Sequence, residues 1–440
     1  ESCACLVGSE MCIRDRKAYY GRQLVQAKVN KVPENVISSA AFIGNTCQRC
    51  GQNVHGKLPN DHFYCRACLA LGRVSSLDVL LSLPEPNDFD GKDILSWTGQ
   101  LTPQQKVVSD ELLETLSRSR EHLVWAVTGA GKTEMLFPVI HQALSQKYRV
   151  AIVSPRVDVI LELAPRLQQA FSQTDMVVLH GAQTETYRYT SLVLATTHQM
   201  LRFKEAFDLL IVDEVDSFPY AGDHMLAYAV KNARKINSSV IYLSATPTKV
   251  LQQQVKRHSL TTSYLPLRFH QHLLPVLKTA IVGPWRKKLP LKFLRQINQF
   301  NQTKRRFLIF VPKVSDLVGV YQNIRKHFPE ISGDHVYAGD PKRQEKVQNM
   351  RNKKIQYLVT TTILERGVTF PGIDVLILGA DEKIFSENAL VQIAGRVGRN
   401  KDRPTGLVKA YVQHTNFKVI AAQRQIKQMN KRGRQLGGRV

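Results

Sequence analysis

A short apolar run that leads directly into a glycine-rich turn most constrains the fold of this chain. The turn lies in the segment Ala126, Val127, Thr128, Gly129, Ala130, Gly131, Lys132 and Thr133, and a stretch of helical periodicity follows it. Strand, glycine-rich turn and helix in this order are the context of a phosphate-binding loop. Its backbone N–H groups can turn toward phosphate oxygens, Lys132 can reach the β and γ phosphates, and Thr133 can coordinate Mg²⁺. We therefore expect residues 128–133 to bind ATP. The structural alternative is a chance glycine-rich turn before a helix.

Short apolar runs alternate with helical stretches along most of the chain. In the first half the runs are 123–127, 150–153, 176–179, 192–195, 209–212 and 240–243, and in the second half they are 307–311, 357–359, 375–378 and 407–412. Buried strands that alternate with helices are typical of doubly wound parallel sheets. The sequence therefore predicts an α/β fold with two such sheets.

The length of 440 residues allows two or three domains. We expect an N-terminal region at 17–92, a first lobe at 93–265, a linker at 266–290 and a second lobe at 291–440. The linker assignment rests on the prolines of that stretch. The second lobe ends in a basic tail, which predicts a charged helix that frays into a flexible arm. Residues 1–16 resemble a cloning or sequencing scar and are left out of the fold argument.

The charge of the chain points to a polyanionic partner. Lysine and arginine number 61 against 36 acidic residues, a formal net charge of +25, as in many nucleic-acid-binding proteins. The alternative is an ordinary enzyme with a generally basic surface. The chain has no run of eighteen apolar residues and no signal-peptide order, so we expect a protein of the reducing cytoplasm without a membrane span.

Paired carboxylates follow the apolar run 209–212. Asp213, Glu214 and Asp216 stand at its end, which is where a nucleotide hydrolase needs acidic groups. Asp213 would hold Mg²⁺, and Glu214 would polarise the attacking water. A solvated acidic cluster at a strand end is the alternative.

Two further motifs surround the phosphate loop in the sequence. Ser244, Ala245 and Thr246 follow the run 240–243, and the order L-T-P-Q-Q ends at Gln105, before the loop. The order resembles the L-T-x-x-Q adenine-reading element of related motors, which implies that Gln105 reads the edge of adenine. Alternatively, these residues are only a helix N-terminus capped at Thr102.

The second lobe carries a glutamine and two arginines in the order Q-x-x-G-R-x-G-R. These residues are Gln392, Arg396 and Arg399. Because residues three apart share one face of a helix, we expect both arginines to point into the cleft between the lobes and to stabilise charge on the γ phosphate. A basic surface helix is the alternative.

Four cysteines have the spacing of zinc ligands. Cys47 and Cys50 are followed, after 14 residues, by Cys65 and Cys68. Two such pairs can converge on one tetrahedral Zn²⁺. His55 or His62 could replace a cysteine, and a redox role for the pairs is the other alternative. The zinc could be purely structural, or it could help to grip DNA through the nearby Arg49, Lys57, Arg66 and Arg73.

Taken together, the motifs A-V-T-G-A-G-K-T, S-P-R, D-E-V-D, S-A-T and Q-x-x-G-R-x-G-R resemble superfamily 2 helicases. Residues 360–362 and 365–368 are similar to motif V of that superfamily. With the preceding four-cysteine module, the order over residues 17–440 resembles the ComFA family of late-competence DNA translocases. PriA is the closest competitor, but PriA-like chains are much longer and carry their cysteines inside the second lobe.

The resemblance implies two RecA-like lobes and ATP-driven movement on single-stranded DNA. It further implies uptake of transforming DNA during natural competence through the ComEC channel, at the inner face of the membrane, with ComFC as a partner. The DNA would contact residues 155–156, 196–198 and 360–362. PriA-like replication restart, an RNA helicase, and a non-catalytic zinc and basic-tail binding module on a degenerate ATPase remain the alternatives.

Overall fold

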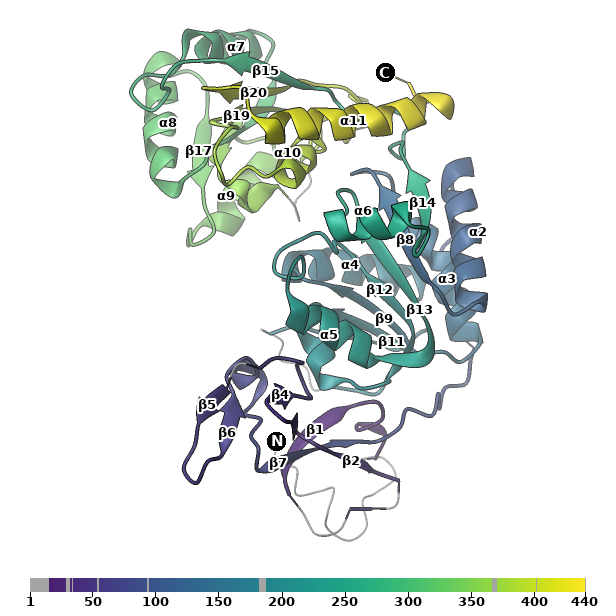
Figure 1. Ribbon diagram of the computed structural model, residues 1–440. Helices are drawn as coiled ribbons and strands as arrows, with labels where there is room; N and C mark the ends of the chain where they lie inside the picture. The colour runs from purple at the N-terminus through teal and green to yellow at the C-terminus, as the bar shows by residue number, and fades with distance from the viewer. Residues whose placement is uncertain are drawn as a thin grey trace. The chain divides into compact units, whose positions relative to one another are not determined.

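The computed structural model describes residues 16–28, 32–33, 35–53, 55–92, 95–181, 187–365, 370–400 and 402–439 (Figure 1). The first fifteen residues, with Cys3, Cys5 and Cys12, lie outside the described residues, as do positions 366–368 of motif V. The chain divides into two compact units. The first unit holds Glu1–Val124 and Lys132–Tyr264, and the second unit holds Trp125–Gly131 and Leu265–Val440.

The first unit is built on a seven-stranded sheet with the order β10-β11-β9-β12-β13-β8-β14. Its strands are β8 (Glu121–Ala126), β9 (Val150–Ser154), β10 (Met176–Leu179), β11 (Leu192–Thr196), β12 (Phe207–Val212), β13 (Arg234–Ser244) and β14 (Thr261–Leu265). The pairs from β10 through β13 are parallel. Every residue of β9, β11 and β12 is buried, which requires cover on both faces of the sheet. The predicted apolar runs of this half each overlap one of these strands.

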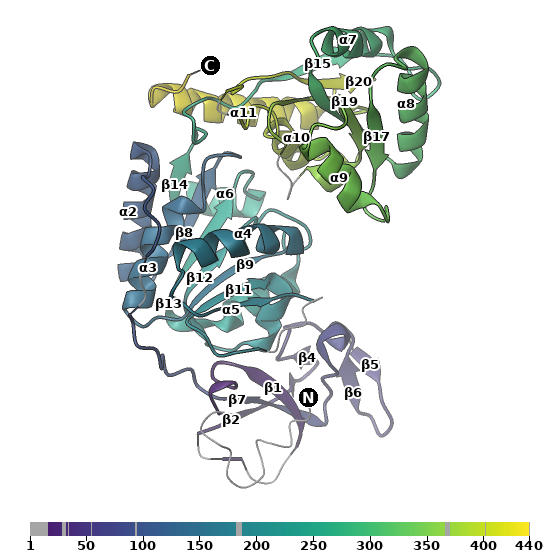
Figure 2. The same ribbon diagram turned by 180° about the vertical axis from the view of Figure 1, so that it is seen from behind.

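Helices lie on both faces of the first sheet. They are α2 (Pro103–Ser117), α3 (Phe137–Ser145), α4 (Val157–Ala170), α5 (His224–Ala233) and α6 (Lys249–Lys256), with the 3-10 turns η3 (Glu134–Leu136) and η4 (Thr197–Arg202). Figures 1 and 2 view the sheet from opposite sides, with α5 in front of it in the first and α4 in front in the second. Helix α4 buries Val159, Ile160, Leu163 and Leu167, the spacing of an amphipathic helix with one face on the core.

The N-terminal region forms small antiparallel sheets that the sequence did not predict. β1 (Gln23–Ala27), β7 (Asp78–Ser82) and β2 (Ile37–Ala40) make a three-stranded sheet. The pairs β3 (Phe42–Ile43) with β4 (Thr46–Cys47) and β5 (His55–Lys57) with β6 (Phe63–Cys65) are short hairpins, and the turn η2 (Leu69–Leu71) follows them. The buried cysteines and Leu80 share one hydrophobic core with residues of the seven-stranded sheet. The N-terminal region therefore packs as part of the first unit.

A buried arginine ties this region to the seven-stranded sheet. Arg149 has no exposed surface, and its guanidinium donates to the carbonyls of Thr190 and Tyr20, each at 3.1 Å, and to the Tyr187 hydroxyl at 2.6 Å. Burying a charge is tolerable only when its hydrogen-bonding groups are satisfied. Arg149 meets that condition, because each guanidinium nitrogen has an acceptor.

The second unit contains a six-stranded parallel sheet with the order β15-β20-β19-β16-β18-β17. Its strands are β15 (Leu277–Ile281), β16 (Arg306–Phe310), β17 (Gly333–Val336), β18 (Tyr357–Thr360), β19 (Ile373–Leu378) and β20 (Val408–Val412). Its helices are α7 (Leu291–Gln302), α8 (Val314–His327), α9 (Arg343–Arg351), α10 (Glu387–Ala394) and α11 (Phe417–Gln435), and the 3-10 turn η5 (Thr362–Leu364) follows β18. Strand β15 lies in the stretch that was expected to be a linker. Its pattern is weak because it is an edge strand with largely unburied side chains.

The basic C-terminal segment forms the charged helix that the sequence predicted, but the helix continues to Gln435 and does not give way to an arm before that residue. Helix α11 runs to Gln435 and buries Val419, Ala422, Ile426 and Met429 on one face. Asn430 accepts a hydrogen bond from the Leu274 amide and donates one to the Leu274 carbonyl, both at 2.9 Å. The lysines and arginines of the opposite face dominate the composition of this segment, so the apolar face was not recognised from the sequence. No helix in the described ranges has the length and apolarity that a bilayer crossing needs.

Asn430 gives a test of this packing. Replacing Asn430 with Ala leaves the buried polar groups of Leu274 without partners, which costs about 1–3 kcal/mol. We expect amide hydrogen exchange in peptides covering 273–281 and 417–435 to accelerate roughly tenfold or more. The exposed neighbour Gln428 supplies the control, since Gln428→Ala changes stability by no more than about 0.5 kcal/mol. Equal exchange in both variants would contradict the role assigned to Asn430.

Candidate nucleotide-binding and metal sites

The predicted phosphate loop follows β8 and leads into η3 and α3. Gly129 and Gly131 have φ angles of +80° and +72°, a region that glycine enters without the steric cost borne by other residues. Consecutive turns of this kind direct backbone N–H groups toward one side, where an anion can bind. Thr128, Ala130, Lys132 and Thr133 occupy the remaining positions of the loop. Residues 128–133 thus have a backbone suited to phosphate.

The acidic strand end lies beside this loop. Asp213 follows the last residue of β12, and its amide donates to the Val153 carbonyl of neighbouring β9 at 2.7 Å. The Lys132 ammonium lies 3.4 Å from the Asp213 carboxylate. Two motifs that are 81 positions apart in the sequence therefore meet at one edge of the sheet. A small pocket there is lined by Lys132, Thr133, Leu136, Ile152, Leu163, Leu167, Asp213 and Leu243.

Glu214 has an unusual backbone conformation. Its φ angle is +53°, and its amide donates to the Asp213 carboxylate at 2.8 Å. Non-glycine residues held in this region are found mainly where surrounding structure enforces them, often at functional sites. Asp213 and Glu214 therefore lie on a tight turn at the strand end and not on an extended strand.

Asp216 connects the acidic motif to the S-A-T motif, a role that sequence reasoning missed. Its two carboxylate oxygens accept from the Ser244 hydroxyl at 2.6 Å and from the Thr246 hydroxyl at 2.5 Å, and all three side chains are buried. A buried carboxylate with two hydroxyl partners is strongly held. The signal in the sequence was the last acid of D-E-V-D, Asp216. Because this residue is buried, it is not part of a solvated acidic cluster.

Gln105 belongs to a helix N-terminus capped at Thr102, which was the alternative to a role in reading adenine. Thr102 caps α2 by accepting from the Gln105 amide at 3.3 Å, and the Gln105 side chain accepts from the Thr102 amide at 2.9 Å. This reciprocal pair is a capping box. Adenine reading by Gln105 stays a prediction.

The two arginines of the second unit do not lie on a helix, so the expectation of a shared helical face is wrong. Helix α10 contains Gln392 and ends at Ala394, with Gly395 as its C-cap. Arg396 and Arg399 lie on the turns that follow, and Gly398 there has a φ angle of +71°. A Cβ at Gly398 would come within 2.1 Å of the Pro404 carbonyl oxygen. The glycines of the motif therefore end the helix and shape the loop that carries the arginines.

Motif V and this arginine loop touch within the second unit. Arg396 is 2% exposed and donates from Nε to the Glu365 carbonyl at 2.9 Å. Arg399 donates from Nε to the Gly395 carbonyl at 3.1 Å. Residues 360–362 stand at the end of β18, directly before this contact. In the first unit, residues 155–156 follow β9, and residues 196–198 begin at the last residue of the adjacent parallel strand β11. These predicted DNA contacts therefore lie at one sheet edge.

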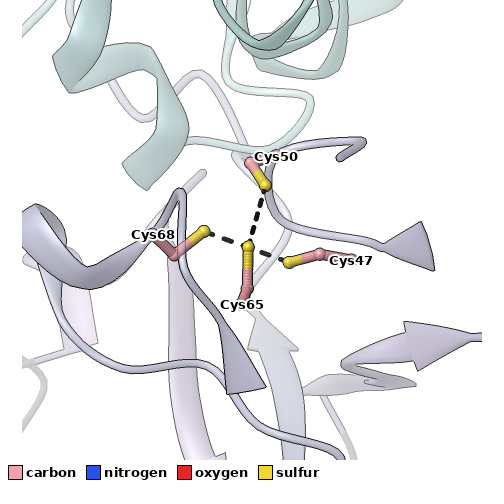
Figure 3. Close-up of side chains that lie close together, drawn as sticks. All are labelled: Cys47, Cys50, Cys65 and Cys68. Atoms are coloured by element: carbon pink, nitrogen blue, oxygen red, sulfur yellow. Dashed lines mark hydrogen bonds between the residues drawn. The ribbon is translucent and has the colours of Figure 1, made fainter. Parts of the chain in front are cut away.

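The four cysteines form one buried cluster (Figure 3). Their sulfur atoms all lie within 4.8 Å of one another, with Cys50 and Cys65 at 3.4 Å and Cys47 and Cys68 at 4.0 Å. Sulfur ligands at about 2.3 Å from Zn²⁺ at the corners of a tetrahedron are roughly 3.8 Å apart, so the donor set fits zinc. The hydrogen bond with Cys47 lowers the pKa of the Cys65 thiol and raises that of Cys68.

Neither candidate histidine belongs to the metal cluster among the described residues. His55 Nδ1 lies 3.0 Å from the Asn53 carbonyl, and His62 Nδ1 lies 3.2 Å from the Ser76 hydroxyl. Arg49 does not fit the alternative of a DNA contact, because it is 4% exposed. It donates to the carbonyls of Leu71, Gly72 and, in η4, Leu201. Arg49 therefore joins the cysteine module to η4, and its buried guanidinium is used in that contact.

Family models match most of both sheets. Residues 98–249 match "Type III restriction enzyme, res subunit", and residues 290–401 match "Helicase conserved C-terminal domain". Among solved structures, Mss116 bound to ssRNA and UDP-BeF is similar with a TM-score of 0.57 and 16% identity, over 71% of this chain and 70% of that one. Lhr of Mycobacterium smegmatis bound to ssDNA and AMP-PNP has a TM-score of 0.53 and 16% identity, over 76% of this chain and 48% of that one. These structures confirm the fold of two RecA-like lobes.

Two curated relatives match nearly the whole chain. Competence protein ComFA of Bacillus subtilis is 42% identical over 87% of this chain and 85% of its own length. Competence protein ComFA of Streptococcus pneumoniae is 41% identical over 88% of this chain and 90% of its own length. The helicase models agree with the phosphate loop, the acidic strand end and the arginine loop in indicating ATP hydrolysis with Mg²⁺. The chain is thus an ATP-hydrolysing superfamily 2 helicase, and it belongs to the ComFA family of competence proteins.

Proposed function

We propose that the chain is an ATP-driven translocase on single-stranded DNA that supports uptake of transforming DNA. The observation that carries the proposal is the meeting of Lys132 with Asp213 at 3.4 Å. It brings a phosphate loop and a Mg²⁺-binding carboxylate to the same sheet edge from which residues 155–156 and 196–198 emerge. The nucleotide and the nucleic acid would thus bind at the ends of neighbouring strands.

Each residue of the proposed nucleotide site has a distinct task. The backbone of residues 128–131 and the Lys132 ammonium bind phosphate oxygens, while the Thr133 hydroxyl and the Asp213 carboxylate hold Mg²⁺. When bound, Mg²⁺ would supply positive charge against the phosphate oxygens. Glu214 orients the attacking water and accepts its proton. Arg396 and Arg399 stabilise the charge that develops on the γ phosphate, and Gln105 and Gln392 contact the nucleotide.

Asp216 offers a physical link between nucleotide state and DNA grip. It sits two residues beyond Glu214 and holds both hydroxyls of the S-A-T motif. A shift of the acidic segment during hydrolysis would therefore be passed to residues 244–246 through two short hydrogen bonds. Buried networks of this kind rearrange as units because a half-satisfied network is costly.

The proposed polymer is DNA because membership of the ComFA family links the chain to competence. A net charge of +25 suits any polyanion, and the loops at the strand ends would bind phosphates without reading sequence. PriA-like replication restart and an RNA helicase are the alternative functions. By the same family resemblance, we propose ComFC and the ComEC channel as partners at the inner face of the cell membrane.

The DNA proposal is tested by ATP hydrolysis with matched single-stranded DNA and RNA oligonucleotides at low salt. We expect DNA to stimulate hydrolysis more strongly than RNA, with stimulation falling as salt rises. Equal or greater stimulation by RNA would favour the RNA helicase, and no stimulation by either polymer would rule out the motor.

Lys132→Ala supplies the matched variant for the same experiment. Because Lys132 is proposed to contact phosphates of ATP and not DNA, hydrolysis should fall by about 10²- to 10³-fold while the affinity for single-stranded DNA stays within about twofold. Fluorescence anisotropy of a labelled oligonucleotide measures that affinity. A normal rate of ATP hydrolysis by Lys132→Ala would contradict the role proposed for the phosphate loop.

We also propose that Cys47, Cys50, Cys65 and Cys68 hold one structural Zn²⁺. The support is the donor chemistry, since four buried sulfurs converge and thiolates are the preferred ligands of structural zinc. The ion would cross-link two short hairpins whose own cores are very small. Because Arg49 joins this module to the carbonyl of Leu201 in η4, loss of zinc would also loosen the segment that begins at Thr197.

Cys65→Ser tests the zinc site by metal analysis. We expect the metal content to fall from about one Zn²⁺ per chain to near zero, with faster hydrogen exchange in peptides covering residues 46–75 and 197–202. Arg66→Ser is the control, because Arg66 is exposed and adjacent to the ligand without being one. A zinc content unchanged by Cys65→Ser would contradict the assignment.

A further inference from the structure

The segment that precedes β15 contains a buried arginine that the proposed function does not use. Arg268 is 1% exposed and is among the largest fully buried side chains of the protein. One nitrogen, Nη1, donates to the Gly398 carbonyl at 2.7 Å and lies 3.4 Å from the Pro404 carbonyl. The other two nitrogens, Nε and Nη2, are buried without a hydrogen-bond acceptor. Most of the donor capacity of this guanidinium is therefore unused.

A comparison with Arg149 shows how unusual this is. Arg149 is equally buried, but each of its three guanidinium nitrogens donates to an oxygen. A buried charge that keeps N–H groups unsatisfied is costly, so such groups call for a specific explanation. Arg268 is also in no ion pair with a carboxylate anywhere in the described part of the chain.

The charged side chain that acts on the pKa of Arg268 is another cation, Arg399. Burial, and to a smaller extent Arg399, lower the pKa of Arg268 to about 9, so Arg268 still carries its charge at neutral pH. Both arginines meet at the loop around Gly398, whose carbonyl also lies 2.9 Å from His270 Nε2. Two like charges held together, one of them with free donors, make a local excess of positive potential that an anion would neutralise.

We propose that Arg268 binds a phosphate oxyanion of the nucleotide, as a further cation beside Arg399. The proposal rests on the proposed function, because it places the phosphate at the arginine loop. A planar guanidinium is suited to binding phosphate, since its Nε and Nη2 lie on one edge of the group and can donate in parallel to two oxygens of one phosphate. Nη1 meanwhile keeps the Gly398 carbonyl in place, so one side chain both shapes the loop and contacts the ligand.

Two other roles are possible for Arg268, and they predict different results. If it only clamps Gly398, its removal lowers stability and leaves ligand binding intact. If its phosphate belongs to the nucleic acid, its removal weakens DNA binding and spares ATP. The position beside Arg399, in the loop that is proposed to act on the γ phosphate, favours the nucleotide.

The test measures thermal stabilisation of the full-length protein by separate ligands. The ligands are Mg²⁺ with a non-hydrolysable ATP analogue, inorganic phosphate, and single-stranded DNA. A ligand that binds the folded state raises Tm in proportion to the logarithm of its concentration over Kd. For Arg268→Gln we expect an affinity for the analogue that is about ten- to hundredfold weaker, a smaller shift with phosphate, and an unchanged shift with DNA.

Two further variants separate binding from folding. Arg268→Lys keeps the charge and one donor for the Gly398 carbonyl but loses the planar guanidinium fork. It should therefore keep the Tm of the unliganded protein while still lowering the affinity for the analogue. Arg306→Gln is the control, because Arg306 donates to the carbonyls of Met350 and Pro371 in the same unit and has no orphaned nitrogen. It should lower Tm without changing the analogue's affinity.

The outcomes distinguish this inference from the proposed function. Arg268→Lys with wild-type affinity for the analogue would overturn the inference, and so would a loss confined to DNA binding. If the wild-type protein itself is not stabilised by the analogue, the proposed nucleotide site fails and the inference fails with it.

Discussion

The nucleotide chemistry of this protein depends on how one buried strand ends. β12 lies between β9 and β13, its residues are all buried, and Asp213 is the first residue to leave the sheet, with its amide still bonded to Val153 of β9. The phosphate loop after β8 leads to Lys132, which meets Asp213 at this strand end. The left-handed turn at Glu214 and the buried Asp216 follow directly, so three acids within four residues have three different environments.

The sequence predicted the parts of the protein that have a strong local signal. Wholly apolar strands such as β9 and β12 could be located because both sheet faces are covered, and the glycines of the phosphate loop mark a turn that other residues resist. The four cysteines were recognisable because zinc ligands must converge. The weak edge strand β15 and the small N-terminal sheets could not be located, since their residues are only partly buried and alternate poorly.

Charged residues were the main source of error. Arg396 and Arg399 were placed on a helix by their spacing, but Gly395 ends α10 and Gly398 turns the chain. The basic residues near the C-terminus suggested a charged helix that frays into an arm, although Val419, Ile426 and Asn430 are buried along α11. Arg49, Arg149 and Arg268 look like surface residues in the sequence and are all buried. Burial of a long cation depends on carbonyls supplied by distant segments, which no local pattern reveals.

The central claim is that Glu214 drives hydrolysis at a site that also controls the grip on DNA. The most direct measurement is single-turnover ATP hydrolysis and ATP-dependent retention on single-stranded DNA by Glu214→Gln, with the exposed Glu162→Gln on α4 as the control. The account predicts that Glu214→Gln binds ATP normally, hydrolyses it at least about a hundredfold more slowly, and stays on DNA as long as ATP is present. Hydrolysis by Glu214→Gln at the rate of Glu162→Gln would contradict the account.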